Sequence, residues 1–257
     1  MNYSHHPQSI GGIILVSLKQ NLVAEFLGTM FLVIAAIGST ILPFTFGVTA
    51  EMMFLVILIN ALAVALVLFA LIETFGSISG AHFNPAVTLA LYLNKEIGAR
   101  KALMYVAVQF LGGFIGLLTV HIMFWDYHPD LLVISSNVKD GTQFFSEFLC
   151  TFILVGVIFG CVKGGSKHTG LSVAFLVGGM LITTVSTMFS NPAVTLSRMF
   201  TYAICGIAPM SGFLFIVAQL LGAGAAVVVF AKVLYPTKLK EKCDPFDCPS
   251  QRPIEIK

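Results

Sequence analysis

Charged residues are scarce in this sequence, and their scarcity limits the class of protein that it encodes. Lys, Arg, Asp and Glu together make up 10% of the 257 residues, whereas soluble globular proteins carry about 25%. Hydrophobic residues make up 57%, and several apolar stretches reach about 20 residues, the length that a helix needs to cross a bilayer. The lack of charge therefore excludes an ordinary soluble domain and predicts a multi-pass membrane protein.

Motifs for catalysis, metal binding and disulfide bonding are also missing. Cys150 and Cys161 fall in or near a predicted helix and Cys243 and Cys248 in the C-terminal tail, which does not indicate a disulfide framework. No phosphate-binding glycine loop, metal-spaced set of His and Cys, or nucleophile arrangement stands out. We therefore expect no enzymatic activity, cofactor, metal site or nucleic-acid partner. A soft-metal site at Cys243 and Cys248 is the alternative to a solvated tail.

The apolar stretches predict an all-α membrane protein with six spanning helices and two shorter ones. We place the spans at about 18–41, 48–75, 101–124, 143–162, 169–190 and 210–235. Two further segments, at about 84–93 and 191–202, are too short to cross a bilayer and are predicted to be half-helices that enter it from opposite sides. A membrane domain at 18–235 then lies between an N-terminal segment, 1–17, and a C-terminal tail, 236–257.

Basic residues concentrate on one side of this predicted topology. If the N-terminus lies in the cytoplasm, every Lys and Arg except Lys139 and Arg198 falls on the cytoplasmic side. The positive-inside rule therefore predicts a cell-membrane protein with both termini in the cytoplasm. Residues 1–12 lack a basic region and a cleavage site, so we expect no signal peptide there.

The two halves of the sequence repeat one pattern. Three segments recur in the same order: 24–29 matches 146–151, 84–89 matches 191–196, and 109–113 matches 219–223. The first repeat covers about 18–124 and the second about 143–235. Because three spans separate the copies, the halves have opposite orientations in the membrane, which is an inverted repeat.

Each repeat interrupts its apolar sequence with Asn-Pro-Ala, at Asn84-Pro85-Ala86 and at Asn191-Pro192-Ala193. Asn is a preferred helix N-cap and Pro suits the first helical position, so a short helix is predicted to begin at each box. Breaks of this kind are tolerated at membrane depth where they line a water-filled space. Inversion brings the two helix N-termini together near the midplane, which indicates a pore.

These features carry a family resemblance. The paired Asn-Pro-Ala boxes, the 79–89 segment Ser-Gly-Ala-His-Phe-Asn-Pro-Ala-Val-Thr-Leu and the twin Glu-Phe-Leu starts resemble the major intrinsic protein family, the aquaporins and aquaglyceroporins. The resemblance covers about residues 18–235. It implies a right-handed bundle of six spans and two half-helices, a homotetramer with one pore in each subunit, and a passive channel for water and small neutral solutes.

The pore chemistry is predicted to centre on Asn84 and Asn191. Each side-chain amide can donate to a solute oxygen, and each half-helix N-terminus carries about half a positive charge, which opposes cations and protons. The resemblance further suggests that backbone carbonyls form a line of acceptors along the pore, at Gly80, Ala81, His82, Thr187, Met188 and Phe189. For His82, packing in the cytoplasmic vestibule competes with a role as a metal ligand or proton relay.

Glu25 and Glu147 are carboxylates within predicted spans, and such residues are functional candidates by default. One hypothesis is proton coupling. The other is that each anchors a re-entrant loop by accepting hydrogen bonds from backbone N–H groups that otherwise lack partners. Their matching positions in the two repeats favour the anchoring hypothesis.

The sequence departs from the family after the second box. An Arg that lines the narrowest point of the pore usually follows Asn-Pro-Ala, but here the residue is Val194. Family spacing places the rest of the filter at Val64, Gly179 and Met188, with Asn60 as the alternative to Val64. This ring has no donor and no charge, so it predicts a wide, apolar filter that passes glycerol-like polyols.

Four alternatives stay open. Family members without the filter Arg include bacterial channels associated with arsenic handling, which suggests arsenous acid or other metalloid hydroxides as solutes. Arg198, one helical turn beyond Val194, is an alternative source of charge at the outer mouth. Different functions altogether would be a transporter that uses Glu25, Glu147 or Glu73 to move protons, or a closed structural member plugged by Met188 and Phe189.

Overall fold

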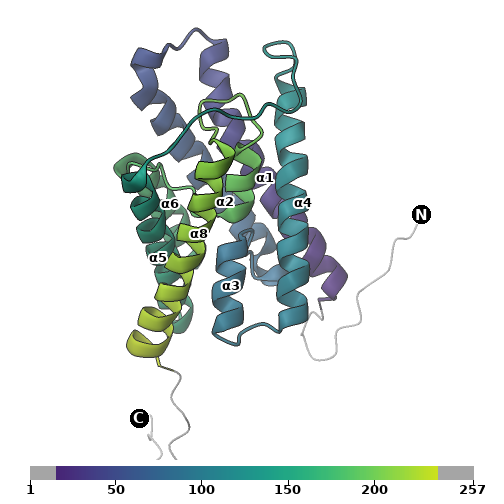
Figure 1. Cartoon of the computed structure of the whole chain (residues 1–257). Helices are drawn as coiled ribbons and strands as arrows, with labels where there is room; N and C mark the ends of the chain where they lie inside the picture. The colour runs from purple at the N-terminus through teal and green to yellow at the C-terminus, as the bar shows by residue number, and fades with distance from the viewer. Residues whose placement is uncertain (1–15, 237–257) are drawn as a thin grey trace, which may run out of the picture.

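Helices form all the elements of the computed structural model, which describes residues 16–236 (Figure 1). The main helices are α1 (Leu18–Thr45), α2 (Met53–Ser79), α3 (Pro85–Leu93), α4 (Ala99–Met123), α5 (Gly141–Lys163), α6 (Thr169–Thr183), α7 (Pro192–Arg198) and α8 (Pro209–Ala226). A short 3₁₀ turn, η1 (Ala50–Met52), precedes α2, and a π-helical segment, η2 (Val227–Leu234), continues α8. The predicted tail, with Cys243 and Cys248, lies outside the described residues.

Five helices are long and apolar enough to cross a membrane: α1, α2, α4, α5, and α8 together with η2. The predicted span at 169–190 is wrong in its second half, because α6 has only 15 residues and ends at Thr183. Its C-cap Thr184 is extended, and the chain then runs without helix to Asn191. The second half-helix is likewise shorter than predicted, since α7 ends at Arg198.

The two ends of the bundle differ in what they carry. Figure 1 shows α1 beginning and η2 ending at the same end, which we call the terminal end. The opposite end carries the long connection between α4 and α5, at 124–140, and we call it the loop end. Within the described residues, the order of the helices places Lys139 and Arg198 toward the loop end. It places the other Lys and Arg residues toward the terminal end.

Close helix contacts repeat the internal symmetry seen in the sequence. Gly112 on α4 faces α1, and a Cβ added to it would lie 2.4 Å from the carbonyl oxygen of Phe26. Gly222 on α8 faces α5, where an added Cβ would lie 2.4 Å from the carbonyl oxygen of Phe148. Small residues of this kind let membrane helices approach closely. The two helix pairs therefore pack in the same way in both repeats.

Candidate functional site

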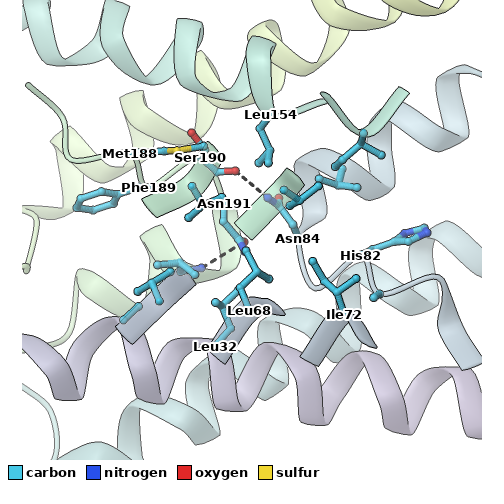
Figure 2. Close-up of a pocket in the computed structure, with 18 of the residues that line it drawn as sticks. Leu32, Leu68, Ile72, His82, Asn84, Leu154, Met188, Phe189, Ser190 and Asn191 are labelled. Carbon is cyan, nitrogen blue, oxygen red and sulfur yellow. Dashed lines mark hydrogen bonds between the residues drawn. The ribbon is translucent and has the colours of Figure 1, made fainter. Parts of the chain in front are cut away.

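A central cavity of about 140 Å³ lies beside the point where α3 and α7 meet (Figure 2). Its wall is mostly apolar and comes from α1, α2, α5 and α6, with Leu32, Leu68, Ile72, Leu154 and Val177 among its members. Its polar groups come mainly from the re-entrant segments before α3 and α7. In Figure 2, His82 lies to one side of the paired Asn84 and Asn191, and Phe189 lies to the other. The cavity therefore has an apolar face and a polar track.

Asn84 and Asn191 both line this cavity and join the two half-helices. The Nδ2 of Asn84 donates to the carbonyl oxygen of Ser190 at 2.7 Å, as a dashed line in Figure 2 shows, and the Nδ2 of Asn191 donates to that of Phe83 at 2.9 Å. Each Oδ1 caps its own helix by accepting from the backbone N–H two residues later, at 2.9 and 3.0 Å. An amide nitrogen has two donors, so these bonds leave a second N–H on each Asn.

The segments that lead into the two boxes have the same unusual backbone. Positive φ angles occur four, three and one residues before each Asn: at Gly80, Ala81 and Phe83, and at Thr187, Met188 and Ser190. Positive φ is uncommon for residues other than Gly, and it is strained unless the surroundings hold it. Neither segment can form helical hydrogen bonds, so each needs other partners for its backbone N–H groups.

Glu25 supplies those partners for the first segment. It is fully buried, its Oε1 accepts from His82 N at 3.0 Å and from the Ser79 hydroxyl at 2.6 Å, and its Oε2 accepts from Phe83 N at 2.7 Å. The backbone N–H groups of His82 and Phe83, which have no helical partners, thus donate to a buried carboxylate.

Glu147 does the same for the second segment. Its Oε1 accepts from Phe189 N and its Oε2 from Ser190 N, each at 2.8 Å. Neither Glu25 nor Glu147 lines the central cavity. Both carboxylates thus accept hydrogen bonds from the re-entrant segments without lining the cavity.

Two glutamines complete these anchors, and sequence reasoning missed their role. Gln109 Nε2 donates to Glu25 at 2.8 Å and to the Thr88 hydroxyl at 3.0 Å. Gln219 Nε2 donates to Glu147 at 2.7 Å and to the Thr195 hydroxyl at 2.8 Å. The signal was available, because both glutamines belong to the matched segments 109–113 and 219–223 and are polar residues within apolar spans.

Comparison with known proteins agrees with this architecture. The family model described as "Major intrinsic protein" matches residues 13–188, more than half of the chain. The chain belongs to the major intrinsic protein family. It is therefore a multi-pass, non-enzymatic membrane channel of the aquaporin and aquaglyceroporin type, for water and small neutral solutes.

Individual relatives within the family support the same fold. The chain is 36% identical over 222 residues to Aquaglyceroporin AqpS of Rhizobium meliloti (strain 1021), covering 86% of this chain and 93% of that protein. It is 30% identical over 249 residues to Nodulin-26 of Glycine max, covering 92% and 86%. The solved structure of the aquaglyceroporin from Plasmodium falciparum superposes with a TM-score of 0.68 at 24% identity, covering 85% of this chain and 97% of that one.

The filter predicted from family spacing needs one correction. Val64, Met188 and Val194 line the central cavity, but Gly179 does not. The α6 residues that face the cavity are Val173, Val177 and Leu181, four residues apart and so on one side of the helix. Gly179 is exposed on the opposite side, with nothing within 4 Å of an added Cβ. Asn60, the alternative to Val64, lies elsewhere, in a second cavity.

Arg198 overturns the prediction that the filter of this family member lacks both donor and charge. The side chain is only 2% exposed and reaches the central cavity from the end of α7. Its Nη2 donates to the Ala36 carbonyl at 3.1 Å, and its guanidinium carbon lies 4.2 Å from the ring centre of Phe189, a cation–π contact. Of the two sequence-based alternatives, the structure supports the one in which Arg198 brings its charge to the pore.

A second cavity of about 270 Å³ opens at the loop end, and we call it the vestibule. Its lining residues are Thr40, Met53, Val56, Ile57, Asn60, Asn137, Lys139, Thr187, Phe189, Arg198, Ile204 and Cys205. Phe189 and Arg198 line both the vestibule and the central cavity. The stacked pair therefore lies at the boundary between the two spaces.

The residues whose carbonyls were suggested as acceptors are distributed over both cavities. Gly80, Ala81, His82, Met188 and Phe189 line the central cavity, and Thr187 lines the vestibule. The His82 ring is paired through Nδ1 with the Thr88 hydroxyl at 3.0 Å. Among the described residues, no group of three or more His, Cys, Asp or Glu is placed to hold a metal ion.

Proposed function

We propose that this channel passes uncharged solutes larger than water, with glycerol-like polyols and metalloid hydroxides such as arsenous acid as its preferred class. The observation that supports this preference is the two-sided central cavity, in which Val64, Met188 and Val194 face the same space as the Asn84 and Asn191 amides. A polyol places its C–H groups against such a wall and its hydroxyls along the donors. Val194, at the position of the usual filter Arg, leaves the room that a larger solute needs.

Transport is proposed to be passive. A proton-coupled transporter needs a carboxylate that meets the solute path and changes protonation there. Glu25 and Glu147 are fully buried, and each accepts hydrogen bonds from its re-entrant segment and from a glutamine. We therefore assign Glu25 and Glu147 to anchoring, and Asn84 and Asn191 to the solute path.

The membrane orientation and assembly are part of the same proposal. The terminal end, with its many Lys and Arg residues, faces the cytoplasm, and the loop end faces outward, as the positive-inside rule requires. The protein works in the cell membrane as a homotetramer with one pore in each subunit, the assembly that the family resemblance suggests.

The test uses purified full-length protein in liposomes. Stopped-flow light scattering measures permeability to water, glycerol and arsenous acid against empty liposomes. We expect glycerol and arsenous acid to enter faster than into empty liposomes, and neither to accumulate above its external concentration when a proton gradient is imposed. Uphill accumulation driven by the proton gradient would contradict a passive channel.

A second candidate rests on the Phe189–Arg198 stack. Because this pair lies at the boundary between the central cavity and the vestibule, the protein is alternatively a closed member of the family. In that case permeability to all three solutes would equal that of empty liposomes. If the Phe189→Ala variant is then permeable while the parent protein is not, the Phe189–Arg198 stack is the part that closes the pore.

A further inference from the structure

Two positive side chains line the vestibule at the loop end, and no acidic residue lines it with them. Lys139 comes from the connection between α4 and α5, and Arg198 comes from the end of α7. Within residues 16–236, neither has a carboxylate oxygen within 4.0 Å, since the ion pair found there joins His128 to Asp130. Two like charges thus share one space of about 270 Å³ without a counter-ion.

Two carboxylates that act on the Lys139 charge, Asp140 and Glu147, accept hydrogen bonds from other groups. Asp140 follows Lys139 directly but caps α5, accepting from Thr142 N at 3.0 Å, the Thr142 hydroxyl at 2.6 Å and Gln143 N at 3.2 Å. Glu147 is occupied by Phe189 N, Ser190 N and Gln219. Neither Asp140 nor Glu147 lines the vestibule.

Arg198 has hydrogen-bonding capacity that the protein leaves unused. A guanidinium has five N–H donors, and the hydrogen bond found for this one goes from Nη2 to Ala36. Its Nε is buried and has no partner within the described residues. A buried donor without an acceptor is destabilising, and more so when it is charged. Arg198 therefore keeps N–H donors beyond the one bonded to Ala36, and the residue lines the vestibule.

The surroundings of Lys139 point the same way. Burial first, and then the positive charge of Arg198, lower the pKa of the Lys139 amine, with smaller opposing effects from Cys205, Asp140 and Glu147. Polar groups fill out the rest of the lining, from Thr40, Asn60, Asn137 and Thr187. An anion between the two basic groups would offset both their desolvation and their mutual repulsion.

We propose that the vestibule is a binding site for a small oxyanion, of the size of sulfate or phosphate, held between Lys139 and Arg198. Arginine and lysine both suit such a ligand, since the guanidinium fork matches two oxygens and the ammonium acts as a point charge. The site lies directly against the Phe189–Arg198 stack. The binding proposal goes beyond the proposed function and does not depend on which neutral solute the channel carries.

Cys205 provides a probe inside the same space. Its half-buried thiol lines the vestibule and lies 3.1 Å from the Thr40 hydroxyl. In full-length protein in liposomes, the rate of Cys205 modification is compared for an anionic and a cationic methanethiosulfonate reagent, each normalised to its rate with a free small thiol. The Cys205→Ser variant gives the background from other cysteines.

We expect the anionic reagent to be favoured about tenfold, the lower range of local concentration effects in charged clefts. Sulfate, added at constant ionic strength with sodium chloride, should slow the modification of Cys205 saturably. Lys139→Gln should lose both the preference and the sulfate protection, Lys139→Arg should keep both, and Lys95→Gln at the terminal end should change neither.

The proposal is overturned if the parent protein shows no anionic preference, or if Lys139→Gln keeps the preference and the protection. It is also overturned if sulfate protects no better than chloride. Because these readouts are rates of thiol modification, they test the anion site even if the liposomes show no solute flux, so a failure of the proposed function is recognised separately.

Discussion

At the scale of single residues, the most informative position is Arg198. Its side chain lines the central cavity although it lies at the end of α7 and not directly after the second Asn-Pro-Ala box. Its backbone lies at the end of α7, yet the guanidinium meets the Ala36 carbonyl of α1 and the Phe189 ring. A long, flexible side chain can cover one helical turn, so the charge is present although the position after the second box is Val194. The position that usually carries the filter Arg holds the smaller Val194, and the charge comes from one turn further along α7.

The small side chain of Val194 predicts how the pore responds when a larger residue replaces it. In Val194→Arg we expect glycerol permeability to fall about tenfold or more, which corresponds to a barrier higher by about 1.4 kcal/mol. The physical reason is that the added guanidinium occupies the apolar wall of the central cavity. Stopped-flow measurements would compare this variant with Val194→Ile, which keeps the wall apolar and should retain most of the flux.

The opposite change removes the charge and keeps the bulk. In Arg198→Met the apolar stem remains, but the fixed positive charge that opposes cations is lost. We expect the passive proton leak to rise about tenfold, within the range over which local charge changes ion access, measured with a pH-sensitive dye inside liposomes. If Arg198→Ala leaves water, glycerol and proton permeability unchanged while Val194→Arg abolishes glycerol flux, the role of Arg198 is contradicted.

At the scale of elements, the two re-entrant segments depend on their buried carboxylates. Glu25→Gln replaces one acceptor oxygen with an amide NH₂ that faces donors, and the loss of hydrogen bonds to a charged group costs roughly 3 kcal/mol. We expect a lower unfolding temperature for the detergent-solubilised protein in Glu25→Gln and in Glu147→Gln. The exposed Glu51→Gln is the matched control, and equal unfolding temperatures in all three would refute the anchoring role.

Helix packing offers a second test with a control only two residues away. An added Cβ at Gly222 would lie 2.4 Å from the Phe148 carbonyl oxygen, whereas at Gly224 it would meet nothing within 4 Å. Gly222→Val should therefore push α8 from α5 and lower stability by about 1–3 kcal/mol, and Gly224→Val should not. Chemical or thermal unfolding followed by circular dichroism would measure the difference.

How far the elements could be predicted from the sequence varies along the chain. The twin boxes and matched glutamates predict the two half-helices and their inverted arrangement, because capping residues act locally. The end of α6 was missed although residues 183–187 are Thr-Thr-Val-Ser-Thr, which breaks the apolar run. Beyond it, Glu147 accepts a hydrogen bond from the backbone of Phe189 in the non-helical segment. Gly179 was placed by counting residues back along the chain, but a change of two residues moves a side chain to the other side of a helix.

Arg198 and the vestibule lie beyond such local rules. The Arg198 position depends on an α1 carbonyl and a re-entrant phenyl ring, which are 162 and 9 residues away in the chain. The sequence marks Lys139 and Arg198 only as the two basic residues outside the cytoplasmic set. Their meeting in one cavity is a result of the tertiary fold.

At the scale of the whole molecule, charge asymmetry predicts the direction of the bundle in the membrane. The terminal end carries Lys19, Lys95, Arg100, Lys101, Lys163, Lys167 and Lys232 among the described residues. The connection at the loop end carries Asp126, Asp130 and Asp140 beside Lys139. Basic residues next to membrane spans are retained on the cytoplasmic side, so the terminal end is expected to stay inside.

Reporter fusions in a bacterial host would measure this orientation. Green fluorescent protein fused after residue 257 should fluoresce, because it folds in the cytoplasm, and alkaline phosphatase fused there should be inactive. Alkaline phosphatase inserted in the 126–138 connection should be active. The reverse pattern would place the vestibule with Lys139 and Arg198 on the cytoplasmic side, and the anion reaching it would then come from inside the cell.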